Sequence, residues 1–510
     1  MAVAAADVAP SEGFATNRWW ILTCSVITMI AVANFQYGWT LFVTPLQKHL
    51  GVEQAAVQIT FTVFVLLETW LVPFEGWLVD RFGPRLLVML GGALAGLGWI
   101  MSGYAESLTG LDGLYVAYAI AGIGAGIVYG TAIGSALKWF PDHRGFAAGL
   151  TAAGFGAGSA LTVWPLNAMI NPEGQPAGSG YQHTFIVWGI IQAIVVIVFA
   201  WFLKAPPEGW RPKTWRLAGG EEIRKRQSGG DFTSAQMVST KQFWLMYFMM
   251  TLVGTGGLMA TAQLAPMAND FKVAQTQVNI LGFMVVALPF ALAADRVING
   301  LCRPFWGWVS DHIGREETMS IAFGLEAIAI YALVSFASNP LLFVIFSAFT
   351  FFGWAEIYSL FPALCGDFFG RKHATANYGF LYTAKGTASV FVPIGSALAA
   401  GKAFDFRADI LILIGLLLVV FAFFVAPSLL RMDLGSAKMV FLLVALAFIA
   451  YAIILTVFPT VSTPFSAKFA MPKWGWTGVF RVAIVFDLAA AVLAYFVLRK
   501  MRVPDLPATA

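Results

Sequence analysis

The sequence predicts an all-α protein that crosses a membrane many times. Of its 510 residues, 59% are hydrophobic and 11% are charged, and the mean hydropathy is +0.76. A soluble domain carries about 25% charged residues. Apolar runs of about 20 residues, long enough to cross a bilayer as a helix, recur along nearly the whole chain. The net charge of +4 says little about nucleic acid, because basic residues of membrane proteins lie mainly where orientation requires them. From the hydrophobic composition we expect the lipid bilayer as partner and no nucleic acid.

Fourteen apolar runs are expected to form the spanning helices. The first six are 19–43, 56–79, 86–104, 113–136, 146–168 and 184–203. A polar stretch rich in charge, Gly and Pro then separates them from a second set of six, which are 243–267, 280–309, 317–337, 341–364, 374–399 and 408–428. Two further runs, 439–459 and 480–498, follow.

These runs predict a domain organisation of two similar halves. It comprises an N-terminal tail (1–18), a six-helix bundle (19–203), a linker (204–242), a second six-helix bundle (243–430) and an additional helix pair with a tail (431–510). Lys and Arg concentrate in the linker and in loops on the side of the N-terminus, which predicts that both termini are cytoplasmic. The first residues are polar and lack a basic region, as expected for a tail rather than a cleaved signal. We expect a monomer in the inner, cytoplasmic membrane.

The two halves repeat each other. The segment "PFEGWLVDRFGPR" after the second helix recurs as "PFWGWVSDHIGRE" after the eighth. Two parallel repeats with this segment resemble the major facilitator superfamily. Its signature Gly-x-x-x-Asp-Arg-x-Gly-x-Arg is met by Gly76, Asp80, Arg81, Gly83 and Arg85, and a degenerate copy keeps Gly307, Asp311, Gly314 and Arg315. The resemblance implies a cytoplasmic gate between the halves at this motif, whereas the alternative is a solvated basic turn.

Two cations of the second half fall inside predicted helices at positions that are apolar in the first half. When the repeats are aligned, Lys385 stands opposite Phe155 and Arg303 stands opposite Val72. Lys385 lies near the middle of its helix, and Arg303 lies about 12 Å from the end of its own. A charge at such a depth costs about 2.5–3.5 kcal/mol on insertion scales. Both cations therefore need an anionic partner.

The sequence offers two sources for that anionic partner. One is the set of carboxylates inside the predicted helices, which are Glu68, Asp295, Glu356 and Asp487. The other is a small anionic substrate, plausibly a dicarboxylate, because Arg offers a planar fork and Lys a mobile point charge. Arg296 shares a helix face with Arg303 and is either a further cation on the substrate path or part of a local ion pair.

Aromatic and polar residues at similar depths carry a closer resemblance. The segments "NFQYGWTLF", "GIVYG", "NGLCRPFWGW", "WAEIYSLFPALCGDFFG" and "YTAKG" are similar to the oxalate:formate antiporter family. That family binds its substrate through cations on helices 8 and 11, which match Arg303 and Lys385. Its site lining matches Gln36, Tyr37, Tyr129, Phe155, Trp354, Tyr358 and Tyr382. Phe155 stands where the family has Tyr, a departure that bears on the exact substrate.

Together these features predict a secondary transporter that exchanges oxalate from outside for formate from inside. The alternative is a proton-coupled symporter of a small monocarboxylate, with Glu68, Asp295 or Glu356 as proton carrier. A non-transporting membrane sensor is a third reading, but the sequence offers no soluble signalling domain. We expect no enzymatic activity, cofactor or metal site, since no nucleophile–base pair or metal-ligand spacing occurs in the sequence.

Overall fold

The computed structural model describes residues 17–108, 110–140, 144–207, 231–370, 373–402 and 471–501. In these ranges the chain is helical except for one β-hairpin, and eight helical segments are long and apolar enough to cross a membrane. The predicted all-α class is confirmed for this part of the chain. The helices expected at 408–428 and 439–459 lie outside the described residues.

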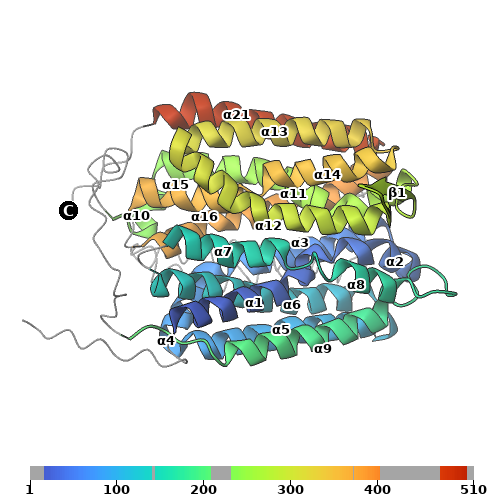
Figure 1. Cartoon of the computed structure of the whole chain (residues 1–510), viewed down its shortest axis with the longest axis horizontal. Helices are drawn as coiled ribbons and strands as arrows, with labels where there is room; N and C mark the ends of the chain where they lie inside the picture. Colours follow the sequence, from blue (N-terminus) through green and yellow to red (C-terminus); the bar gives the residue numbers. More distant parts are fainter. Residues whose placement is uncertain are drawn as a thin grey trace, which may run out of the picture.

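In its described residues the first bundle contains nine helical segments. They form the lower part of the view in Figure 1. They are α1 (Arg18–Tyr37), α2 (Thr40–Leu50), α3 (Gln54–Trp70), α4 (Val72–Phe82), α5 (Pro84–Leu108), α6 (Leu111–Trp139), α7 (Arg144–Ala157), α8 (Val163–Ile170) and α9 (Tyr181–Ala200). Small residues let these helices pack closely, and a Cβ on Gly96 of α5 would overlap Ala193 of α9.

The second bundle is drawn above the first in Figure 1. Its helices are α11 (Lys241–Asp270), α12 (Ala287–Ile313), α13 (Arg315–Ser335), α14 (Pro340–Trp354), α15 (Ile357–Phe369), α16 (Ala374–Ser389), α17 (Phe391–Ala400) and α21 (Gly475–Val492), and α21 continues through the short turns Leu493–Val497 and Leu498–Lys500. A short helix, α10 (Ser234–Val238), precedes them inside the expected linker and is capped by Thr233.

Helix α21 occupies the place in the second bundle that α9 occupies in the first. Whereas α9 packs on α5 and α1, α21 packs on their repeat counterparts α13 and α11 (Figure 1). The Trp476 indole nitrogen donates to Asp270 Oδ2 at 2.7 Å, and Arg499 pairs with Glu317 at 2.9 Å. We expected the run 480–498 to lie outside the two bundles, but the structure makes α21 an integral part of the second.

Five of the expected helices are split in two within the membrane. The breaks fall at Gly38, at Leu71, between α7 and α8, between α14 and α15, and at Val390. Pro73 and Pro393 follow two of them by two or three residues. Proline lacks an N–H and disfavours helical geometry in the residue before it, so it weakens the helix at these points.

The helix expected at 280–309 begins later than predicted. Residues 277–286 form an antiparallel hairpin of β1 (Gln277–Ile280) and β2 (Phe283–Val286), and α12 starts at Ala287. Leu281 and Gly282 form the turn with positive φ angles of 51° and 94°. The Asn279 side chain fixes the turn by accepting from the Gly282 N–H at 2.9 Å. The β-branched residues on either side favour strands over a helix.

The two bundles meet along α3 with α16 and α17, and along α7 with α12. The end of the protein that carries the β-hairpin, here called the hairpin end, is closed by hydrogen bonds between α2–α3 and α11. The Gln58 side chain donates to Ala262 O at 2.9 Å, and Gln54 donates to Gln263 at 2.9 Å. These bonds seal the interface on one side of the cations described next.

Candidate functional site

Lys385 lies on α16 where that helix contacts α3 of the other bundle. A Cβ on the next residue, Gly386, would overlap Thr69 and Trp70 of α3, so only glycine permits this approach. The Trp70 indole also donates to Thr383 O at 3.1 Å and ties the two helices together. The lysine is thereby held at the interface between the bundles.

The Lys385 ammonium is fully hydrogen-bonded. It donates to Gln36 Oε1 at 2.8 Å and to the Tyr382 hydroxyl at 3.0 Å. Glu68 of α3 accepts from it with both carboxylate oxygens, at 3.0 and 2.9 Å. An ammonium has three N–H groups, so these partners satisfy all of them. Lys385 is 1% exposed and Glu68 is 0% exposed, and the pair is therefore shielded from water.

Arg303 lies on α12 and is held differently. Its Nη1 donates to Ala152 O of α7 at 2.7 Å, and its Nη2 donates to Asn299 Oδ1 at 3.0 Å. Gly156 of α7 makes room for the guanidinium, because a Cβ there would lie 3.1–3.2 Å from three of its atoms. Among the described residues, the Nε of Arg303 has no hydrogen-bond partner. Neutral acceptors thus orient this cation without cancelling its charge.

The two cations lie over one ring. Arg303 Cζ is 4.5 Å and Lys385 Nζ is 5.8 Å from the centroid of Tyr358. Further rings enclose them: Tyr129 stacks on Tyr382 at 5.2 Å, and Phe155 contacts Tyr37 at 5.3 Å. Trp354 packs edge-on against Tyr358 at 5.4 Å. Rings with negative faces stabilise a buried cation while leaving its N–H groups available.

All nine residues predicted to line the site come together between the bundles. They are Gln36, Tyr37, Tyr129, Phe155, Arg303, Trp354, Tyr358, Tyr382 and Lys385, and none is more than 7% exposed. Residues of α1, α6 and α7 face residues of α12, α14, α15 and α16. The constellation is closed off from water and is shared by both halves of the protein.

The question of which group neutralises the cations has a different answer for each. Glu68 forms an ion pair with Lys385, as the carboxylate alternative predicted. Among the described residues, no carboxylate lies within ion-pair distance of Arg303. The carboxylates of Glu356 and Asp487 have no hydrogen-bond partner in the described part of the chain and do not pair with either cation.

Arg296 does not form the local ion pair considered from the sequence. Its guanidinium lies between the rings of Tyr37 and Phe351, 4.5 and 4.2 Å from their centroids, and none of its nitrogens has a hydrogen-bond partner in the part of the chain that the structure describes. A third cation therefore backs the Tyr37 wall of the site. Its spacing from Arg303 on one helix face was the signal for this position.

Three further residues of the site escaped sequence reasoning. Asn299 orients Arg303, and Gln58 accepts from the Trp39 indole at 3.0 Å below the hairpin end. Glu75 of α4 is 2% exposed with no hydrogen-bond partner, and a Cβ on Gly126 of α6 would lie 2.9 Å from its carboxylate. The available signal for Asn299 was its position one helical turn before Arg303. The helices of Gln58 and Glu75 carry no predicted lining residue, so no such signal existed for them.

The predicted gate residues lie at the opposite end from the hairpin. Gly83 and Gly314 end α4 and α12 with φ angles of 80° and 104°, so the two copies of the motif end their helices in a similar backbone conformation. Arg85 lies 5.3 Å from the Trp201 ring, and Arg315 pairs with Asp367 at 3.4 Å. The side chains of the other predicted gate residues, Asp80, Arg81 and Asp311, are outside the described set, and Gly76 has none.

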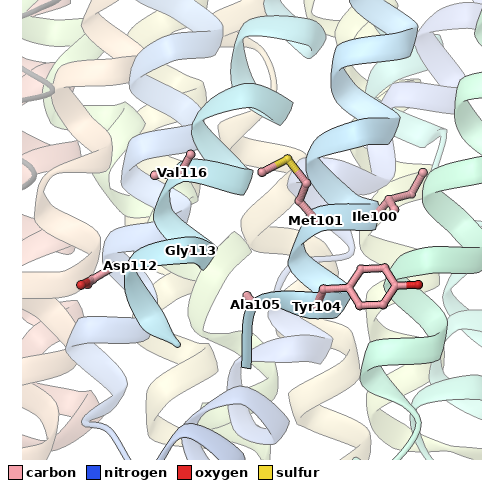
Figure 2. Close-up of a pocket in the computed structure, with 7 residues that line it drawn as sticks. All are labelled: Ile100, Met101, Tyr104, Ala105, Asp112, Gly113 and Val116. Atoms are coloured by element: carbon pink, nitrogen blue, oxygen red, sulfur yellow. The ribbon is translucent and has the colours of Figure 1, made fainter. Parts of the chain in front are cut away.

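A separate apolar pocket lies between α5 and α6 (Figure 2). It is lined by Ile100, Met101, Tyr104, Ala105, Asp112, Gly113 and Val116. Tyr104 and Val116 are 49% and 55% exposed, so this pocket opens on the outer surface of the first bundle. It contains no cation and is distinct from the site between the bundles.

Comparison with known proteins gives a consistent picture. The family model of the Major Facilitator Superfamily matches residues 24–298 and 243–463. The oxalate:formate antiporter of Oxalobacter formigenes is 36% identical over 84% of this chain and 96% of its own length. An uncharacterized MFS-type transporter of Escherichia coli, YhjX, is 24% identical over 74% of this chain and 87% of its own. The apicoplast pyruvate carrier 1 of Toxoplasma gondii is 24% identical over 61% and 63%.

Proposed function

Because the chain belongs to the Major Facilitator Superfamily, and within it to the oxalate:formate antiporter family, we propose that it exchanges small carboxylate anions by alternating access. The cargo we propose is oxalate entering the cell in exchange for formate leaving it. Membership of this superfamily makes the protein a multi-pass membrane transporter rather than an enzyme. We further propose that it works as a monomer in the inner membrane with both termini in the cytoplasm.

The observation that carries the proposal is a buried guanidinium that no carboxylate of the described residues neutralises. Arg303 is 1% exposed, keeps a free Nε, and shares the ring of Tyr358 with Lys385. An unpaired charge in a water-free interior is strongly unfavourable, so this position favours an anion as its missing partner. A planar fork beside an ammonium suits one or two carboxylate groups.

The position of the site supports alternating access. It lies where the bundles meet, and several of the helices around it are split, including α1–α2, α14–α15 and α16–α17. Transporters of this type bind cargo near the middle of the membrane and rock one bundle against the other around it. An anion that touches both bundles would therefore stabilise the closed state through which they pass.

The charge of the empty site supports exchange rather than one-way movement. With Glu75, a buried carboxylate without a cation beside it among the described residues, protonated and the other groups ionised, the cations Lys385, Arg303 and Arg296 exceed the anions Glu68 and Asp295 by one positive charge. A net charge raises the cost of enclosing the empty site away from water. Bound anion removes that charge, so the loaded protein should reorient faster than the empty one.

The test is anion exchange by the purified protein in liposomes. R303Q and K385Q should each lower the initial rate of labelled oxalate exchange by at least about 30-fold, the effect expected for truncating a buried charged contact. K402Q is the matched control, because Lys402 is 54% exposed and pairs with Glu53 at the surface. Normal exchange by R303Q would overturn this site, and full uptake into liposomes without a counter-anion would overturn exchange.

The second candidate is proton-coupled symport of a monocarboxylate. The observation that favours it is the buried Glu68–Lys385 pair. A carboxylate that releases its ammonium partner and binds a proton instead can carry that proton across the membrane. Uptake driven by an imposed pH gradient, with no stimulation by anion on the opposite side, would support it over exchange.

A further inference from the structure

Glu68 occupies the place that an anionic substrate of Lys385 would take. Both carboxylate oxygens lie within 3.0 Å of Nζ, and the remaining N–H groups of Lys385 are directed to Gln36 and Tyr382. A substrate carboxylate can therefore reach the ammonium only if Glu68 gives it up. Arg303 has no such internal competitor.

This asymmetry fixes the charge that the site can accept. While Glu68 is ionised, Lys385 is neutralised and one positive charge, centred on Arg303, is left for the cargo. A monoanion then makes the site neutral. When Glu68 is protonated, Lys385 is released, two positive charges are available, and a dianion makes the site neutral. An enclosed site is most stable when its net charge is zero.

The surroundings of Glu68 favour protonation once Lys385 turns to the cargo. The charged and titratable groups that face it are Glu75 of α4, Tyr129 of α6, Tyr358 of α15, and Tyr382 and Lys385 of α16. Helix α1 offers the amide of Gln36, and α17 offers no titratable side chain. Lys385 is thus the only cation of that set, and Glu75 is a second acidic group close to Glu68. A buried carboxylate without a cation is far more stable protonated.

We propose that Glu68 is the internal counter-anion of Lys385 and that it binds one proton whenever the cargo is a dianion. The inference rests on the proposed anion exchange. On the outer side, a proton from water binds the Glu68 carboxylate, Lys385 stays an ammonium, and oxalate takes its place between Lys385 and Arg303. On the inner side, oxalate leaves, the proton passes to water, and Glu68 pairs with Lys385 again. Formate binds Arg303 with the Glu68–Lys385 pair intact.

Exchange of oxalate for formate then moves no net charge. Oxalate with one proton enters carrying one negative charge, and formate leaves carrying one. Without the proton, each turnover would move one negative charge inward. A membrane potential would then shift the limiting oxalate distribution by about 50-fold per 100 mV. The response of the oxalate distribution to a membrane potential therefore distinguishes exchange with the proton from exchange without it.

The experiment uses the full-length protein in formate-loaded liposomes, with the potential set by valinomycin and a potassium gradient and internal pH reported by trapped pyranine. The wild type should acidify the interior by one proton per oxalate and should be insensitive to an interior-negative potential. E68Q should move no protons, should be slowed by that potential, and should prefer oxalate over formate by about tenfold more than the wild type, equivalent to about 1.4 kcal/mol. E326Q is the matched control, since Glu326 is a buried glutamate of α13 that faces Gly256 and Asp487 and not Lys385.

Two results would overturn the inference while leaving anion exchange standing. One is wild-type exchange that moves charge and no proton, and the other is an E68Q profile identical to the wild type. Absence of any oxalate or formate exchange by the wild type would instead overturn the proposed function. Should E68Q fail to fold with its lysine unpaired, E68Q/K385Q removes both charges and should exchange formate without moving protons. Proton movement by that double variant would also count against Glu68.

Discussion

Lys385 and Arg303 carry the same charge but are held in ways that suit different tasks. The lysine ends in a point charge that Glu68, Gln36 and Tyr382 surround, and it can exchange one partner for another. The arginine is fixed by Ala152 O on one side and by Asn299 on the other, so its remaining N–H groups keep one direction. Arg303 therefore serves as the permanent anchor and Lys385 as the variable one.

The anchor role predicts that charge alone does not replace Arg303. R303K keeps the positive charge but loses the planar fork and the two fixed hydrogen bonds. We expect the KM for formate to rise by about tenfold or more, as for the loss of a charge-assisted hydrogen bond. Exchange rates over a range of formate concentrations measure it. A wild-type KM in R303K would show that the fork plays no part in binding.

Sequence reasoning named nine residues that the structure brings together, but it did not predict how they pair. Buried charge, aromatic residues and the family motifs pointed to all nine lining residues, because each signal is local to one helix. Which of the four candidate carboxylates named from the sequence meets Lys385 depends on how α3 and α16 pack, and Glu68 is 317 residues away in the chain. Composition and periodicity carry no information on such a contact, so the pair could only be left as an alternative.

At the level of elements, glycine decides where the bundles can approach each other. Gly386 lies on α16 one residue after Lys385, and Gly156 and Gly300 let α7 and α12 close around Arg303. Helix positions were predicted well because long apolar runs have a clear length. The breaks at Gly38, Leu71 and Val390 and the hairpin before Ala287 were missed, because each depends on local turn chemistry inside an apolar run.

Gly386 offers a direct test of that contact. In G386A the added methyl group would overlap Thr69 and Trp70, and overpacking of this kind costs about 1–3 kcal/mol. We expect a lower melting temperature and slower anion exchange, because α16 is pushed away from α3 and Lys385 from Glu68. G324A is the matched control, since nothing lies within 4 Å of a Cβ on that glycine of α13. Equal melting temperatures for the two variants would contradict the close contact.

Over the whole molecule, the two repeats share one architecture and divide the chemistry unequally. The second bundle supplies Lys385 and Arg303, whereas the first supplies Glu68 and Gln36. The equivalent packing of α9 and α21 shows how similar the scaffolds are. Because the cations lie on one bundle and the internal counter-anion on the other, cargo, charge and closure of the interface depend on one another.

Alternating access requires the hairpin end to open in every cycle, and that end can be locked. Thr44 of α2 and Asn269 of α11 are hydrogen-bonded across the bundles at 3.3 Å and reach the surface. In T44C/N269C, a short reducible bis-thiosulfonate should stop oxalate–formate exchange, and a reductant should restore it.

The three native cysteines are buried and stay unmodified under mild labelling. Q175C/S179C, a pair within the first bundle whose native side chains are 3.3 Å apart, is the control and should exchange normally when cross-linked. Unchanged exchange by cross-linked T44C/N269C would mean that the bundles do not separate there.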